Sequence, residues 1–253
     1  RGRPSAHRAF EKLHRANGWS ASAEQYGASA AILLGDLLLS WADELLRTSG
    51  LPSDRILRAL RYFDLTRSEV VLGQFLDISA QARGANDVDT AMKVVRYKSA
   101  KYSIERPLHV GAALAGGSDE SIEQLTRFGL PLGEAFQLRD DLLGVFGDPE
   151  VTGKPAGDDL TEGKRTVLIA LAMDGLTPDR AQELDSSLGT SLSPPQVERL
   201  RYLIEKSGAR EQVEQVIDQL TQTALKSLEQ AEITEGARQA LGQLAQSATQ
   251  RTV

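Results

Sequence analysis

The chain of 253 residues contains no cysteine. This absence excludes disulfide bonds, thiolate metal sites and a cysteine nucleophile. Histidine is scarce as well, and His7, His14 and His109 have no spacing that would suit a shared metal ion. We expect these three side chains to be structural or exposed, so any chemistry in this chain must come from other residue types.

Three larger features are also missing from the sequence. No apolar run approaches the roughly 18 residues of a membrane-spanning helix. Residues 1–8 contain no apolar segment of the kind found in a signal peptide. The net charge is −6, which argues against a nucleic-acid-binding protein, because such proteins carry a basic face. We therefore expect a cytoplasmic protein with no membrane span and no nucleic-acid partner.

What is present is the composition of a globular protein with a sizeable core, with 41% hydrophobic and 25% charged residues. Apolar residues recur at helical spacing, and no segment alternates as a strand does. The expected helices are 22–47, 53–84, 86–116 and one from Ser118 through Asp141, kinked at Pro131, with later helix starts at Thr177, Ser193 and Thr234. No linker divides the chain, so we expect a single all-α domain over residues 1–253.

Two adjacent carboxylates, Asp140 and Asp141, end the fourth of these helices. Gln137 lies three and four residues before them, which places it on the same side of the helix. A lone aspartate pair is commonly a solvated helix edge. Here the pair lies late in an apolar helix, where the helix dipole disfavours negative charge, so a bound cation would account for it. Magnesium with a polyphosphate is the interpretation that we favour.

A loop over residues 147–163 follows, and loops of that length are usually functional or disordered. Lys154 lies within it and Lys164 directly after it, and each follows a glycine. Neither fits a phosphate-binding P-loop, because the glycine spacing is wrong and no strand precedes it. Simple solubility is the alternative interpretation for either lysine.

The helical pattern also falters inside the core at Lys98 and Ser99. A break in a helix frees carbonyl oxygens, and such breaks concentrate at functional sites. The alternative is that Ser99 only bends the helix through a hydrogen bond to a backbone carbonyl.

Taken together, these elements resemble the trans-isoprenyl diphosphate synthases, also called polyprenyl synthetases, of the bacterial short-chain type. The resemblance covers nearly the whole chain, and its motifs occur in family order. They are Gly35-Asp36, Tyr97-Lys98-Ser99-Ala100, Phe136-Gln137-Leu138-Arg139-Asp140-Asp141, Phe146-Gly147-Asp148, Thr152-Gly153-Lys154-Pro155, Gly157-Asp158-Asp159-Leu160 and Glu162-Gly163-Lys164-Arg165-Thr166.

The resemblance implies the isoprenoid synthase fold, a bundle of long antiparallel helices around a central substrate cavity, assembled as a homodimer. The implied enzyme is a Mg²⁺-dependent prenyltransferase. It would join isopentenyl diphosphate to dimethylallyl, geranyl or farnesyl diphosphate and release geranylgeranyl or farnesyl diphosphate. By position, Asp140 and Asp141 would bind magnesium, and Lys98, Lys154 and Lys164 would hold the allylic diphosphate. Gln137 and the carbonyls near Ser99 would face the allylic cation, and Arg1 would contact isopentenyl diphosphate.

The sequence departs from the family pattern in two places. The second aspartate-rich motif normally ends in a third aspartate, where this chain has Gly144, and Asp148 is one candidate to replace it. The first aspartate-rich motif would lie upstream of Arg1, so we expect the chain to be part of a protein of roughly 350 residues. Two alternatives stay open: a non-catalytic partner or regulatory subunit of a prenyl synthase, and a class I terpene cyclase.

Overall fold

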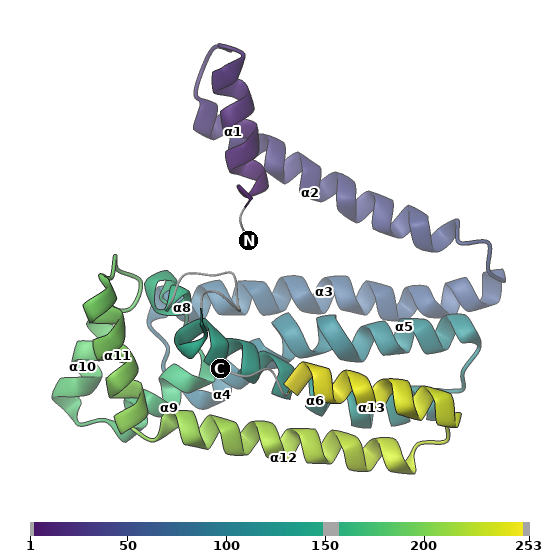
Figure 1. Cartoon of the computed structure of the whole chain (residues 1–253). Coiled ribbons are helices and arrows are strands. Elements are labelled where there is room, and N and C mark those ends of the chain that lie inside the picture. Colours follow the sequence, from purple (N-terminus) through teal and green to yellow (C-terminus); the bar gives the residue numbers. More distant parts are fainter. Residues whose placement is uncertain (1–2, 149–156, 250–253) are drawn as a thin grey trace. The chain divides into compact units, whose positions relative to one another are not determined.

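The structure, a computed structural model, describes residues 3–148 and 157–249. Every regular element in these two ranges is a helix, and no strand occurs in them, which confirms the predicted all-α class (Figure 1). The chain divides into two compact units, Arg1–Ile56 and Leu57–Val253. The expected single domain therefore stays a prediction, and the two units are described separately.

The first unit is built on two packed helices, α1 (Ala6–Ala16) and α2 (Ala23–Arg47). Ser22 caps α2 as predicted, because its hydroxyl accepts a hydrogen bond from the Gln25 backbone N–H at 3.2 Å. Gly27 brings the two helices close together, since a side chain there would lie 3.1 Å from the backbone nitrogen of Glu11. Hydrophobic packing on α1 uses only part of α2, which leaves many large apolar side chains exposed.

The second unit contains a set of long helices that run lengthwise and a group of shorter helices at one end (Figure 1). The lengthwise elements are α3 (Ser53–Arg83), α4 (Val88–Val94) with the π-helix η1 (Val95–Glu105) and α5 (Arg106–Ala115), α6 (Asp119–Phe146), α12 (Ala209–Gln230) and α13 (Glu235–Thr249). The shorter elements are α8 (Asp158–Glu162), α9 (Val167–Gly175), α10 (Pro178–Ser187) and α11 (Pro194–Lys206).

Local sequence signals explain where several of these helices begin. Ser118 and Asp87 accept hydrogen bonds from the backbone three residues on, at 3.1 and 2.7 Å, and start α6 and α4. Helices α10 and α11 begin at the proline after Thr177 and Ser193, as the sequence predicts. Helix α6 continues through Pro131 without ending.

Helix α6 is the centre of the second unit. It packs against η1, α5, α8, α9, α12 and α13, and Phe128, Leu132, Leu138 and Leu142 are fully buried along it. Burial of this kind is worth about 1.5–3 kcal/mol for each large apolar side chain. The core thus holds the helix that carries the aspartate pair along its length.

A buried guanidinium ties the far end of the chain to this central helix. Arg139 makes a two-pronged ion pair with Glu214 of α12, with both contacts at 2.6 Å, and its Nε donates to the backbone oxygen of Thr249 at 3.0 Å. Planar guanidinium and carboxylate groups suit this geometry. The turn of α6 directly before Asp140 is therefore fixed to α12 and to the end of α13.

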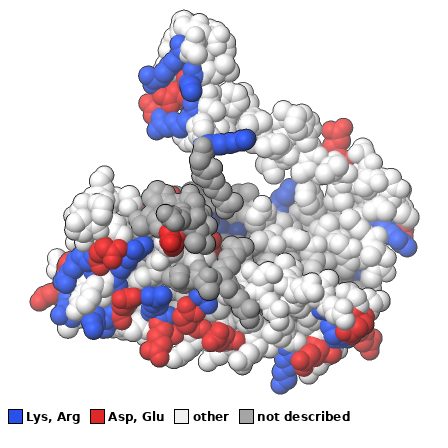
Figure 2. All heavy atoms as spheres, viewed as in Figure 1, with Lys and Arg blue, Asp and Glu red and all other residues white. Residues whose placement is uncertain are grey.

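Charge on the surface is mixed rather than segregated. Figure 2 shows lysine and arginine side chains lying among aspartate and glutamate side chains at the end where α10 and α11 lie, for example Arg199 paired with Glu183 at 2.8 Å. The face seen in Figure 2 carries no broad basic patch of the kind that nucleic acid requires. None of the helices in the described ranges combines the length and the apolar character needed to cross a bilayer.

Candidate functional site

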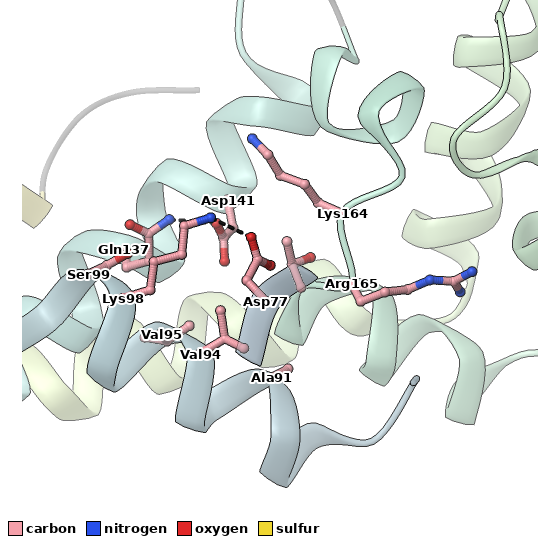
Figure 3. Close-up of a pocket in the computed structure, with 11 residues that line it drawn as sticks. Asp77, Ala91, Val94, Val95, Lys98, Ser99, Gln137, Asp141, Lys164 and Arg165 are labelled. Carbon is pink, nitrogen blue, oxygen red and sulfur yellow. Dashed lines mark hydrogen bonds and ion pairs between the residues drawn. The ribbon is translucent and has the colours of Figure 1, made fainter. Parts of the chain in front are cut away.

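Four helices of the second unit and the connection between α8 and α9 line a small pocket of about 50 Å³. Helix α3 contributes Asp77, the π-helix contributes Lys98 and Ser99, and α6 contributes Gln137 and Asp141. Lys164, Arg165 and Thr166, between α8 and α9, and Ala91, Val94 and Val95 complete the lining. Figure 3 shows the polar groups of Lys98, Gln137, Asp141 and Asp77 pointing toward one another, whereas Arg165 points away.

Asp141 is one of two buried carboxylates that line this pocket, with only 6% of the residue exposed. Burial and, to a smaller extent, the nearby carboxylates of Asp159 and Asp140 raise the pKa of its carboxyl to about 7, against the opposing effect of a 2.8 Å hydrogen bond from Gln137. Asp140 is half-buried and is not among the lining residues. Adjacent residues on a helix point about 100° apart, so only one of the predicted pair faces the pocket directly.

The predicted interruption at Lys98 and Ser99 is a π-helical stretch of 11 residues. Its hydrogen bonds run from residue i to i+5, and π-helical segments are frequent at functional sites. The ammonium of Lys98 binds the Asp77 carboxylate at 2.6 Å, and the backbone oxygen of Ser99 accepts a hydrogen bond from the Ser103 hydroxyl.

Asp77 is a site residue that sequence reasoning missed. It is 7% exposed, although its neighbours Phe75 and Ile78 are largely exposed apolar residues. The available signal was a lone acidic residue within an otherwise apolar stretch of a long helix, which is costly to bury without a partner.

Lys164, in the connection between α8 and α9, also lines the pocket. Its ammonium pairs with the buried carboxylate of Asp159 and, at 3.2 Å, with Glu162. Burial would lower the pKa of its ammonium, but the hydrogen bond and charge of Asp159, together with those of Glu162, outweigh burial and raise the pKa, so the group is cationic. Asp159, also missed as a site residue, had only the Gly157-Asp158-Asp159 motif to indicate it.

The carboxylate of Asp159 lies directly against Gly144, in space that a Cβ at position 144 would overlap. Gly144 is the position where the family pattern has its third aspartate. Asp148, the candidate replacement from the sequence, is exposed just beyond the end of α6. A carboxylate from the chain beyond α6 therefore occupies the room that the missing side chain leaves.

Oxygen ligands for a hard cation are thus present, but they are few. Within residues 3–148 and 157–249, no group of three acidic or histidine side chains could hold a metal ion by itself. Magnesium suits such a site, because it is usually bound through one or two carboxylates together with water and substrate phosphates. The donor set of Asp141, with Asp140 and Asp159 nearby, fits magnesium that arrives with a phosphorylated ligand.

The pocket brings together five predicted site residues: Lys98, Ser99, Gln137, Asp141 and Lys164. A sixth, Asp140, directly precedes Asp141 in the chain but does not line the pocket. Arg1 and Lys154 lie outside the described residues, so their expected substrate contacts stay predictions.

Comparison with known proteins agrees with the geometry. The family model described as polyprenyl synthetase matches residues 1–207. A geranylgeranyl diphosphate synthase of Mycobacterium tuberculosis is 32% identical over 209 residues, which cover 81% of this chain and 59% of that protein. A geranylfarnesyl diphosphate synthase of Aeropyrum pernix is 33% identical over 192 residues, which cover 75% of this chain and 59% of that protein. The chain thus spans 59% of the length of each of these two relatives.

Solved structures are similar over the whole fold. The crystal structure of geranylgeranyl pyrophosphate synthase from Corynebacterium glutamicum, complexed with isoprenyl diphosphate and magnesium, has a TM-score of 0.96 and 45% identity, covering 100% of this chain and 71% of that chain. A polyprenyl synthetase from Streptomyces coelicolor has a TM-score of 0.81 and 26% identity, covering 96% of this chain and 75% of that chain. These likenesses confirm the fold that the resemblance implied.

Proposed function

We propose, from the premise that this chain belongs to the polyprenyl synthetase family, that the intact protein is a magnesium-dependent prenyltransferase. It joins isopentenyl diphosphate to an allylic diphosphate (dimethylallyl, geranyl or farnesyl) and releases a short all-trans product, geranylgeranyl or farnesyl diphosphate. The observation that carries this proposal is the pocket itself: two lysines and a buried carboxylate converge on it from separate elements.

The lysines hold the allylic diphosphate. Lys98 forms an ion pair with Asp77, and Lys164 forms one with Asp159. A diphosphate offers each ammonium an anion of higher charge, so both lysines can turn from these carboxylates toward it without being left unpaired. Lys154 and Arg1 add positive charge toward the diphosphates of the allylic substrate and isopentenyl diphosphate, respectively.

The carboxylates hold magnesium. Asp141, with Asp140 and Asp159, supplies oxygen ligands, and Gln137 orients the Asp141 carboxylate through its 2.8 Å hydrogen bond. Magnesium, when bound, neutralises the charge that develops on the departing diphosphate. The side-chain oxygen of Gln137 and the backbone oxygen of Ser99 stabilise the allylic cation as negative dipoles that are already in place.

A homodimer in the cytoplasm completes the proposal. Its support is the exposed apolar surface on the two long helices α2 and α3, where Leu33, Leu45, Leu72 and Phe75 are 66–74% exposed. Contiguous exposed apolar side chains of this kind mark protein interfaces.

The test is steady-state prenyl transfer by the full-length protein with Mg²⁺, isopentenyl diphosphate and each allylic diphosphate. Lys164→Ala should raise KM for the allylic substrate about tenfold or more, the equivalent of 1.4 kcal/mol, and leave KM for isopentenyl diphosphate nearly unchanged. Lys226→Ala, an exposed lysine on α12, is the matched control and should change neither constant.

The alternatives give different results in the same assay. A terpene cyclase would release diphosphate from the allylic substrate when isopentenyl diphosphate is withheld. A partner subunit would be inactive alone and would change the activity of an added synthase. Equal effects of Lys164→Ala on both substrates would contradict the assignment of this lysine.

A further inference from the structure

A second cluster of charges lies next to the pocket on two of the same elements. Its centre is Glu69 of α3, which is two helical turns before Asp77. The carboxylate of Glu69 accepts hydrogen bonds from Lys101 Nζ at 2.7 Å and from Arg106 Nε and Nη2 at 2.7 and 2.8 Å. All three side chains are only 11–16% exposed. One carboxylate thus binds two cations. Lys101 lies in the second half of the π-helix, and Arg106 is the first residue of α5.

Glu69 is the charged partner of both cations. Burial would raise the pKa of its carboxyl, but the hydrogen bonds from Arg106 and Lys101 outweigh burial and lower the pKa. Glu105, the other acid nearby, is 3.9 Å from Arg106, and burial raises the pKa of its carboxyl. One Glu105 oxygen is buried and makes no hydrogen bond. Arg106 also contacts the Nδ1 of His109 at 3.1 Å, but Glu69 is the carboxylate that hydrogen-bonds both cations.

The same face of α3 also fits the π-helix sterically. Glu69, Gly73 and Asp77 are spaced four residues apart and share one face of the helix. A Cβ at Gly73 would lie 2.7 Å from the Lys98 Cα, so the backbone that carries Lys98 touches α3 directly. On the opposite side, a Cβ at Gly133 of α6 would lie 2.7 Å from the Ala100 Cα.

These two glycines form a slot for a wide segment. A π-helical turn takes in more residues than an α-helical turn, so it needs more room, and it is the less favourable helix by itself. The slot supplies room and dispersion contacts, but it pairs no charges. Ion pairs on both sides of the slot attract the segment to α3. Asp77 pairs with Lys98 in the first half of the π-helix, and Glu69 pairs with Lys101 and Arg106 further along the chain.

We infer that Glu69 is a positioning residue for the prenyl-transfer reaction: by binding Lys101 and Arg106, it holds the Lys98–Ser99 segment in its π-helical form and in register with the pocket. This inference rests on the proposed function. Without the clamp the segment can relax toward an α-helix, and each residue taken out of the π-helical turns rotates the following side chains by about 100°. Lys98 and the Ser99 carbonyl would then no longer face the pocket together.

The experiment compares the wild type with Glu69→Gln, which keeps the side-chain length and removes the charge. Hydrogen exchange in the ligand-free protein should be at least about tenfold faster for the amides of Val95–Glu105 and unchanged in α9 and α12. Calorimetry with Mg²⁺ and an unreactive allylic thiodiphosphate should give a Kd about tenfold weaker, while KM for isopentenyl diphosphate stays within about twofold.

Two further variants keep the test decisive. Lys101→Met removes one cation but leaves the Arg106 pair, so it should give a smaller change in the same direction if Glu69→Gln does not fold. Asp119→Asn is the matched control, because it breaks the 2.6 Å pair between α3 and α6 at Arg58, away from the π-helix. It should change neither exchange in residues 95–105 nor the thiodiphosphate Kd.

The outcomes separate the two proposals. If the wild type does not bind the thiodiphosphate, the proposed function fails, and hydrogen exchange alone still tests the clamp. If the wild type binds it and Glu69→Gln binds equally well with unchanged exchange over residues 95–105, the positioning role is overturned. A fall in melting temperature with no change in Kd would also overturn it, because Glu69 would then serve stability only.

Discussion

Replacing Asp141 with asparagine should stabilise the magnesium-free protein at neutral pH. The pKa of this buried carboxyl is raised from 3.8 to about 7. A group whose pKa is raised on folding opposes folding as pH rises, because the unfolded chain ionises near pH 4 whereas the folded chain ionises only near pH 7. A shift of about three pKa units corresponds to about 4 kcal/mol, and the penalty is complete only above pH 7.

The side chain of asparagine has the same shape and cannot ionise. Its amide oxygen can still accept the hydrogen bond that Gln137 donates at 2.8 Å to the present carboxylate. Any cost of the amide that does not depend on pH cancels when two pH values are compared. The stability of Asp141→Asn relative to the wild type should therefore increase by about 3 kcal/mol between pH 5 and pH 8.

Denaturant unfolding in the presence of a chelator at both pH values measures this difference. Leu142→Ala is the control, since it truncates a fully buried neighbour and should destabilise the protein by about 2–5 kcal/mol at either pH. A relative stability that is the same at pH 5 and pH 8 would refute the reasoning, because the carboxylate would then carry no penalty for ionisation. Added Mg²⁺ with diphosphate should stabilise the wild type far more than the variant.

Two other positions give sharp expectations. Burial, with the charge of Arg106, lowers the pKa of His109 to about 4, so stability should fall by about 3 kcal/mol as pH falls from 6.5 to 4. In His109→Gln, with a chelator present, the free energy of unfolding should fall much less between pH 6.5 and pH 4. An unchanged dependence on pH would mean that other groups cause the fall. Gly144→Ala should displace the Asp159 carboxylate, cost about 1–3 kcal/mol in stability and weaken binding of Mg²⁺ with diphosphate in calorimetry. Unaltered binding would mean that Asp159 has no part in holding the metal.

The sequence predicted the helices well because their signals are local. The cap at Ser22 and the prolines after Thr177 and Ser193 mark helix starts through neighbouring backbone groups alone. The interruption at Lys98 and Ser99 was visible for a similar reason, since a change of helix type breaks the 3.6-residue period. Its extent and its π-helical form were not visible, because they depend on a slot made by glycines far away in the sequence.

The candidate site was predicted in part. Lys98, Gln137, Asp141 and Lys164 stood out because polar residues at those points disturb an apolar pattern or follow glycine turns. Asp77 and Asp159 did not, because what distinguishes them is burial beside a particular lysine, which only the packed structure defines. The same limit explains why Asp140 and Asp141 looked equivalent although only Asp141 lines the pocket.

The tie between Arg139 and the backbone oxygen of Thr249 has a consequence for how the protein is made. It joins residues 110 positions apart, and contacts of such long range form late, after the cost of closing the intervening chain has been met. Synthesis runs from the N-terminus, so α6 leaves the ribosome well before α13 exists. Before α12 emerges, Arg139 can bind neither of these partners, and before α13 emerges it can form only the ion pair with Glu214. The turn beside the aspartate pair can gain this contact only after α13 has been translated, so a nascent chain passes through a stage in which α6 is present but Arg139 lacks its backbone partner.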